Sequence, residues 1–477
     1  MLWSFTGTIG VRIIGLITSI ILARMVSPEI FGIAGMALVF VGFTYVIQEA
    51  GLSSTIIQKP KINHTIVATT FSLNIILSII LVIVIYLSAS SIAAFYQQPE
   101  VEILLNYAGI GVFVGSLGIT QRALLTRERK FKILTKVDLI AELVTSVVSV
   151  LLAVLNYPLL AISLSMLFRP AVQSLCLILV TAKRRIIGKP NFKILREILP
   201  YSSNVLGVRV VNFIRNHVDY LLIGKLLGSA SLGIYTIAFQ WSTVARFYFS
   251  QSIAKVAFPE VSRNQHDIDK VREIYLNLVR KISFVTFPFC LGLVLVASEF
   301  IHVFYGEKWM ETVPALQILM IAGMISSIGT IVGAFFKGLG RPDIELKLNI
   351  FSLISFTILI YIGSFYGIIG VAVAVLINTI TFNTFMTLKI CSHLNLKLKV
   401  YVESLYSSGL SVFIMVAIVY LTRVNFMNDS SSLISLVILS LTGVFVYSIS
   451  SYYFNKDMMK WIMQKLDKIS YLKWRKQ

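Results

Sequence analysis

Charged residues are scarce in this chain of 477 residues, because Asp, Glu, Lys and Arg together make up only 13% of it. A soluble domain carries about 25%. The chain has no GxxxxGKS/T phosphate loop and no HExxH zinc motif, so it is not expected to hydrolyse ATP or to hold a metal or another cofactor. It has only three cysteines, one each in an apolar stretch and without disulfide or metal spacing: Cys176, Cys290 and Cys391. These absences exclude a soluble enzyme and a disulfide-stapled secreted protein.

Apolar residues are abundant instead, at 57% of the chain, and they form runs of about 20 residues, the length that spans a bilayer as a helix. A β-barrel is not expected, since its strands alternate in polarity and are about 10 residues long. We therefore predict an all-α polytopic membrane protein with about 14 transmembrane helices. The predicted spans are 2–23, 30–50, 68–95, 102–122, 138–156, 159–182, 200–224, 233–257, 277–304, 314–336, 346–364, 368–390, 404–423 and 432–454.

The net charge of +20 would indicate nucleic acid in a soluble protein, but in a membrane protein Lys and Arg mark the cytoplasmic loops. Loops after odd-numbered spans carry only Arg24, Lys225, Lys308 and Arg423, so both termini are predicted to be cytoplasmic. No nucleic-acid partner is expected. Two basic stretches, 266–282 and 456–477, have apolar residues at helical spacing and are predicted to lie on anionic inner-leaflet lipids.

An internal repeat is visible in two strings 201 residues apart, RMVSPEIFGI from Arg24 and KLLGSASLGI from Lys225. This offset covers six spans, which predicts two pseudo-symmetric six-helix lobes of the same orientation followed by two C-terminal helices. A duplicated bundle is typical of carriers that work by alternating access. The expected parts are an N-lobe (1–182), a basic cytoplasmic linker (183–199), a C-lobe (200–390), spans 13 and 14 (391–454) and a basic amphipathic cytoplasmic tail (455–477).

Charges inside the spans are the first candidates for function, because each costs about 2.5–3.5 kcal/mol on insertion scales. In the seventh span the polar side chains fall within an arc of about 140° on a helical projection. Such a stripe must face water, since lipid would leave its groups unsatisfied. The candidate binding residues are four arginines of spans 1, 7 and 8 with the polar residues of span 7: Arg12, Arg209, Arg215, Arg246, Tyr201, Asn204, Asn212 and Asn216.

Structural roles remain open for several of these charges. Asp219 lies four residues after Arg215, so the two side chains can neutralise each other with or without a role in a cavity. Arg12, Arg209 and Arg246 have no acid three or four residues away, which leaves pairing between helices as their structural alternative. Arg169 precedes Pro170 and is a candidate for gating or ion pairing. Two acids, Glu49 and Glu142, are candidates for proton or ion coupling, with packing as the alternative.

Six strings together resemble the Wzx-type lipid-linked oligosaccharide flippases of the polysaccharide export family, in the superfamily that includes multidrug exporters. The most specific is FIRNHVDYLLIGKLLGSASLGIYTIA (residues 213–238). The others are EAGLSSTIIQK (49–59), QRALLTRERKFK (121–132), FPEVSRNQHD (258–267), YGEKW (305–309) and GLGRPD (338–343). They cover most of the chain in family order. One departure is that the chain begins almost inside its first span, whereas such proteins usually start with a short basic segment.

The resemblance implies a transporter rather than an enzyme, in a bacterial plasma (inner) membrane. Its substrate would be a polyprenyl-pyrophosphate-linked oligosaccharide or repeat unit, moved from the inner to the outer leaflet for exopolysaccharide, O-antigen or capsule synthesis. Polysaccharide polymerase and assembly proteins are expected partners. Guanidinium groups bind pyrophosphate through paired, charge-assisted hydrogen bonds, which suits the four arginines, and the Asn and Tyr side chains suit sugar hydroxyls. Asp219 would compete for Arg215 when the site is empty.

Two other functions stay open on the sequence alone. A multidrug-type cation antiporter on the same fold would need an acidic cavity, whereas the charges inside the spans include slightly more bases than acids. A membrane-embedded glycan transferase would need acids or a sizeable domain at one membrane face, and the predicted exterior loops are short.

Overall fold

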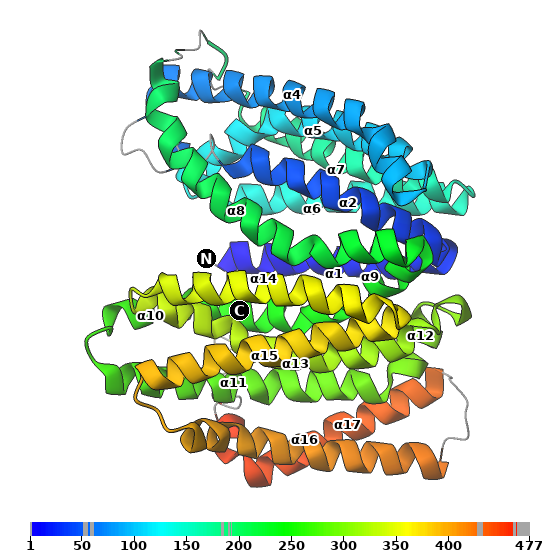
Figure 1. The fold of residues 1–477 in the computed structure, drawn as a ribbon, viewed down its shortest axis with the longest axis vertical. Helices are drawn as coiled ribbons and strands as arrows, with labels where there is room; N and C mark the ends of the chain where they lie inside the picture. Colours follow the sequence, from blue (N-terminus) through cyan, green and yellow to red (C-terminus); the bar gives the residue numbers. More distant parts are fainter. Residues whose placement is uncertain are drawn as a thin grey trace, which may run out of the picture. The chain divides into compact units, whose positions relative to one another are not determined.

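The computed structural model describes residues 2–50, 56–57, 62–182, 186–188, 191, 193–426, 433–460 and 464. Within these ranges the chain forms helices joined by short turns and no β-strand (Figure 1). Contacts group the chain into two compact units, Met1–Gly233 and Ile234–Gln477. The boundary falls inside a helix, α9.

Unit 1 is built around one central helix, α5, which contacts α2, α4 and α7, while α6 contacts α1 and α7 (Figure 1). Local signals set the helix ends: the Asn63 side chain accepts the Ile66 N–H at 2.9 Å to cap α4, and Pro158 opens α7. The helices are α1 (Leu2–Met25), α2 (Pro28–Ala50), α4 (His64–Tyr96), α5 (Glu100–Arg127), α6 (Phe131–Val154), α7 (Pro158–Val180), α8 (Lys193–Leu226) and the start of α9 (Gly228–Ala245).

The two copies of the repeated string meet at the first turns of α2 and α9. A Cβ atom on Gly32 would overlap the carbonyl oxygen of Ser229, and a Cβ atom on Gly233 would overlap that of Pro28. Gly233 lies 201 residues after Gly32, and Ser229 lies 201 residues after Pro28. The contact is therefore reciprocal, as a local two-fold axis requires. Both glycines are needed because only a residue without a side chain lets the two backbones approach this closely.

Unit 2 is built around α13, which contacts α10, α11 and α15. A buried apolar cluster joins these helices, with Val279, Ile331, Phe335 and Ile390 fully buried in it. After the start in α9, the elements are the π-helical turn η1 (Arg246–Ser250), α10 (Gln251–Arg263), α11 (Ile268–Leu295), α12 (Ala297–Phe304), the 3-10 turn η2 (Glu307–Trp309), α13 (Thr312–Gly338), α14 (Pro342–Ser364), α15 (Gly367–His393), α16 (Leu398–Phe426) and α17 (Leu433–Phe454).

Eleven of the described helices are long and apolar enough to cross a membrane. This confirms the all-α polytopic class, although it does not reach the predicted count of about 14. Predicted span 200–224 is absent from the eleven because α8 carries Arg209, Arg215 and Asp219 close together, and span 233–257 is interrupted by η1. Predicted span 2–23 corresponds to α1. The predicted boundaries between lobes, linker and tail stay predictions.

The prediction of a surface helix over 266–282, followed by a separate span over 277–304, is wrong. One continuous helix, α11, starts at Ile268 after the side chain of Asp267 caps the Lys270 N–H at 3.0 Å. Val271 and Tyr275, which the prediction placed against lipid, are fully buried in the core of unit 2. The helix ends at Leu295, and after Val296 the next helix, α12, begins at Ala297. The other predicted surface helix, 456–477, lies largely outside the described residues.

The YGEKW motif has a structural role in unit 2, since Tyr305 and Trp309 are almost completely buried. The indole N–H of Trp241 in α9 donates a hydrogen bond to the Tyr305 hydroxyl at 2.7 Å. Burial raises the pKa of Tyr305 to about 12, so this hydroxyl is neutral at physiological pH. The motif thus fixes the turn between α12 and α13 against α9.

An ion pair between a partly exposed arginine and a buried glutamate ties the end of α16 to the break between α11 and α12. Arg423 lies 3.2 Å from the carboxylate of Glu299, which is 4% exposed, and it donates a hydrogen bond to the Leu295 carbonyl at 3.1 Å. Removing the arginine leaves a buried carboxylate without its countercharge. Leaving a buried group without its partner costs about 1–3 kcal/mol, less than for a fully buried pair because the Arg423 side chain is 37% exposed.

We therefore expect Arg423→Ala to lower the thermal unfolding midpoint of the purified protein by several degrees. The double variant Arg423→Ala, Glu299→Ala should recover much of this loss, because it removes both charges. Thermal unfolding in detergent, followed by intrinsic fluorescence, measures both. Equal midpoints for wild type and Arg423→Ala would contradict the stabilising role of the pair.

Candidate functional site

Helix α8 carries the densest set of predicted binding residues. The side chains of Arg209, Asn212 and Asn216 are exposed, and Arg215 is half-buried. Asp219 is only 1% exposed and accepts the backbone N–H of Tyr220 at 3.0 Å. The predicted ion pair between Arg215 and Asp219 stays a prediction. Two further predicted side chains on this helix, those of Tyr201 and Asn204, lie outside the described part of the structure.

The other predicted arginines lie on two separate helices. Arg12 is exposed on α1 in unit 1. Arg246, half-buried, is the first residue of η1 in unit 2, and its carbonyl accepts the Gln251 N–H five residues later. Such π-helical turns are rare and frequently occur at functional sites. The side chain of Glu49, one of the two predicted coupling acids, is not among those described.

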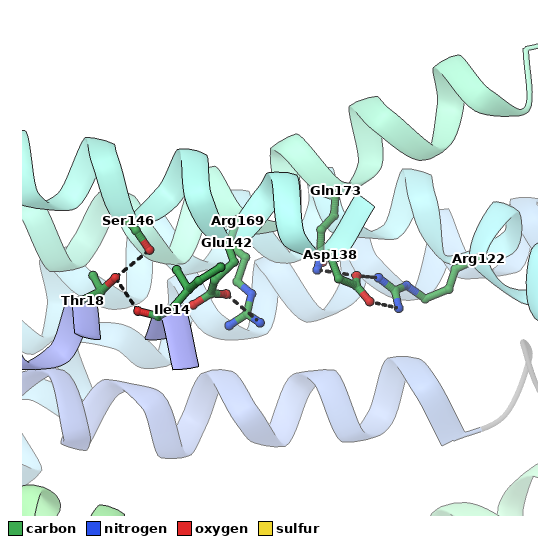
Figure 2. Close-up of polar contacts among 8 residues, drawn as sticks. All are labelled: Ile14, Thr18, Arg122, Asp138, Glu142, Ser146, Arg169 and Gln173. Carbon is green, nitrogen blue, oxygen red and sulfur yellow. Dashed lines mark hydrogen bonds and ion pairs between the residues drawn. The ribbon is translucent and has the colours of Figure 1, made fainter. Parts of the chain in front are cut away.

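A partly buried polar cluster on α6 joins three neighbouring helices of unit 1 (Figure 2). Three polar residues, Asp138, Glu142 and Ser146, follow at four-residue spacing, which puts them on one face of α6. Asp138 is paired with Arg122 of α5 and accepts a hydrogen bond from the side-chain amide of Gln173 in α7 at 3.1 Å. This carboxylate is therefore neutralised and held from two sides.

One turn further along α6, Glu142 lies 3.0 Å from the guanidinium of Arg169 in α7 (Figure 2). Its facing oxygen, Oε2, is buried and has no aligned hydrogen-bond donor among the described residues. The pair is thus a charge contact rather than a well-formed hydrogen bond. Glu142 is buried, but 48% of the Arg169 side chain is exposed. The structure thus brings together two predicted site residues, Glu142 and Arg169, in one ion pair.

Helix α1 packs against the same polar face of α6. A Cβ atom on Gly15 would lie 3.0 Å from Glu142 Oε1, so α1 covers one side of that carboxylate. At the next turn the Thr18 hydroxyl lies 2.8 Å from both the Ile14 carbonyl oxygen and the Ser146 hydroxyl. The polar face of α6 is therefore enclosed by α1, α5 and α7 within one unit.

Sequence reasoning missed the partnership of Arg122 with Asp138. The two residues lie at the end of one predicted span, 102–122, and the start of the next, 138–156. The four-residue spacing of Asp138 and Glu142 was the available signal, since it places two acids on one helix face that needs two cations. The unit 2 hairpin between α13 and α14 has a comparable pair, Lys337 and Glu345, at 3.3 Å.

An apolar cavity of about 730 Å³ lies in unit 2 among α11, α12, α16 and α17. Ser440, Tyr447 and Ser448 supply the few polar groups that line it. A cavity of this size and polarity suits a hydrocarbon chain. Its apolar lining includes Phe289, Leu293, Phe300, Val419, Leu436 and Val444.

Comparison with solved structures identifies the class of this fold. The chain superimposes on the lipid II flippase MurJ in an inward closed conformation with a TM-score of 0.80 and 19% identity, covering 96% of this chain and 100% of MurJ. An inward-facing multidrug resistance MATE family transporter gives a TM-score of 0.61 and 20% identity, over 81% of this chain and 95% of the transporter. The molecule therefore has the fold of the MurJ and MATE transporters.

Its sequence places it more narrowly, because residues 21–314 match the model of a polysaccharide biosynthesis protein family, and the chain belongs to that family. It is 27% identical to the lipopolysaccharide biosynthesis protein WzxC of Escherichia coli K12, over 79% of this chain and 78% of WzxC. It is 26% identical to the teichuronic acid biosynthesis protein TuaB of Bacillus subtilis, over 77% of this chain and 79% of TuaB. Similar relatives thus occur in bacteria that assemble different polymers.

Proposed function

We propose that this protein is a flippase that moves a polyprenyl-pyrophosphate-linked oligosaccharide or repeat unit from the inner to the outer leaflet of a bacterial plasma membrane. The observation that carries the proposal is α8, a helix of a transporter fold that exposes Arg209, Asn212 and Asn216. The names of WzxC and TuaB, which refer to lipopolysaccharide and teichuronic acid, support a sugar polymer pathway, and MurJ, with the same fold, is named for flipping lipid II.

The anionic headgroup accounts for arginines in membrane helices. A pyrophosphate loses its hydration when it crosses the hydrocarbon layer, and guanidinium groups replace that hydration with paired, charge-assisted hydrogen bonds. Arg12, Arg209, Arg215 and Arg246 would supply these bonds, and Asp219 would hold Arg215 when no substrate is bound. The exposed Asn212 and Asn216, with Tyr201 and Asn204, would contact sugar hydroxyls.

The lipid tail and the surroundings of the protein complete the proposal. The apolar cavity of unit 2 would take part of the polyprenyl chain, which avoids water while the headgroup moves. Both termini would be cytoplasmic, with the basic tail over 456–477 on anionic inner-leaflet lipids. Alternating access would come from two repeat-related lobes, and a polysaccharide polymerase with its assembly proteins would take the product.

Reconstitution tests the proposal directly. Proteoliposomes containing the purified protein should move a labelled polyprenyl-pyrophosphate sugar across the bilayer, so that an added enzyme or quencher reaches it. We expect Arg209→Ala to slow this movement about tenfold, the effect of losing one charge-assisted hydrogen bond of about 1.5 kcal/mol. Lys399→Ala, which removes an exposed cation at the start of α16, is the matched control and should leave the rate unchanged.

Two outcomes would contradict the proposal. One is movement of cationic dyes in exchange for protons with no movement of the lipid-linked sugar, which is the behaviour of a cation antiporter. The other is equal slowing by Arg209→Ala and Lys399→Ala, which would show that charge on the protein in general, and not α8, sets the rate.

A further inference from the structure

The two carboxylates of α6 differ in how firmly they are held. Asp138 has its cation, Arg122, and a hydrogen bond from Gln173. Among the residues that the structure describes, Glu142 has only the charge contact to Arg169, without an aligned donor on the oxygen that faces it. Of the two pairs, the one between Glu142 and Arg169 is therefore the easier to separate.

The two members of this pair also differ in their access to water. The Arg169 side chain is 48% exposed, whereas that of Glu142 is 12% exposed. A guanidinium in a membrane helix faces water or protein rather than lipid, because lipid cannot solvate it. An anion arriving from water can thus contact the exposed side of Arg169, while Glu142 stays enclosed by α1 and α7.

We propose that Glu142 is a competing counter-ion for Arg169: the anionic headgroup of the substrate displaces it from the guanidinium, and Glu142 then takes up a proton. This inference rests on the proposed function. The physical reason is that a buried carboxylate that loses its cation is strongly unfavourable, and binding a proton from water removes its charge. When the headgroup leaves, Glu142 releases the proton and pairs with Arg169 again.

The other groups near this pair leave Arg169 as the partner that Glu142 depends on. On α6 itself, the neighbouring charge of Asp138 is matched by Arg122 of α5. From α7, Gln173 donates to Asp138. Among the described residues, α1 contributes Arg12, which lies three residues before Gly15 and has interactions of its own, and α2 contributes Tyr45, which interacts electrostatically with Arg169.

The proposal fixes the sign of a pH effect on substrate binding. Where Glu142 is ionised it competes for Arg169, so affinity for a pyrophosphate lipid falls as the pH rises. Where Glu142 is protonated the competition is absent. One proton linked to binding changes the dissociation constant by up to about tenfold per pH unit over the range in which Glu142 titrates.

Binding of farnesyl pyrophosphate to the full-length protein in nanodiscs, measured from pH 5 to 8.5, tests this linkage. The pyrophosphate also titrates, so the wild-type dissociation constant is divided by that of Glu142→Gln at each pH. We expect this ratio to rise between pH 5 and pH 8.5, by about tenfold in all. Glu299→Gln, which changes the buried paired glutamate of unit 2, is the matched control and should follow the wild type.

Parallel profiles for wild type and Glu142→Gln would overturn the inference while leaving the flippase proposal intact, because the wild type would still bind the probe. No binding by the wild type would instead count against the proposed function and take the inference with it. If Glu142→Gln does not fold, Glu142→Asp answers the same question. Its carboxylate is one methylene further from Arg169, so it must bind the probe more tightly than wild type at pH 8.

Discussion

Replacing Arg246 by alanine is expected to reduce transport of the lipid-linked sugar by on the order of 100-fold, with normal amounts of protein in the membrane. The half-buried guanidinium at the start of η1 would give the headgroup a charge-assisted hydrogen bond of about 3 kcal/mol, at the upper end of the range for charged groups. A loss of this size corresponds to about two powers of ten in rate.

The comparison with lysine makes this prediction specific to the guanidinium. Arg246→Lys keeps the charge but loses the planar fork that binds two phosphate oxygens, so we expect an intermediate rate. Lys255→Ala, which removes an exposed cation nine residues later on α10, should transport at the wild-type rate. The measurement is movement of labelled substrate in proteoliposomes, with polymer export in cells as a second readout. Equal rates for Arg246→Ala and Lys255→Ala would exclude Arg246 from the binding site.

The local turn at Arg246 could not be predicted from the sequence, because it depends on packing against another helix. Before the turn, the backbone at Ser242 lies against Gly323 of α13, and after it Val261 of α10 lies against Gly338 of the same helix. A π-helical turn contains one more residue than an α-helical turn, which lets both contacts form at once. Hydrophobic periodicity contains no information about a contact of this kind.

The helices themselves followed from apolar runs and caps, since their lengths depend on bilayer thickness and on local signals. The prediction over residues 266–304, a surface helix followed by a separate span, is wrong for a clear reason. Lys270, Arg272 and Arg280 lie on a helix whose other face is fully buried, and a basic helix packed on protein has the same pattern as one lying on lipid.

In the candidate site, the sequence likewise identified single residues but not which of them form pairs. Charges inside spans identified Glu142 and Arg169 one by one, because the cost of burying a charge is a property of the single residue. Their pairing involves α6 and α7, and that of Arg122 with Asp138 involves α5 and α6. Which side chains meet across helices depends on helix rotation and crossing, which a single sequence does not specify.

A second large effect is expected where α2 and α9 meet. Gly32→Ala should lower the thermal unfolding midpoint strongly and reduce the amount of folded protein in the membrane, because its Cβ atom would overlap the backbone carbonyl of Ser229. Overpacking of this kind costs about 1–3 kcal/mol. Helix propensity alone would give the opposite result, since alanine stabilises a helix interior by about 1 kcal/mol relative to glycine.

Two comparisons separate this steric effect from other consequences of the substitution. Gly409→Ala in α16, where a Cβ atom meets nothing within 4 Å, should leave the protein as stable as wild type or slightly more so. Gly233→Ala should resemble Gly32→Ala, because its Cβ atom would overlap the carbonyl of Pro28 in the reciprocal contact. The double variant should lose less stability than the sum of the two, since the first alanine already forces the helices apart. Full additivity, or a Gly32→Ala variant as stable as Gly409→Ala, would mean that the two helix starts do not pack reciprocally.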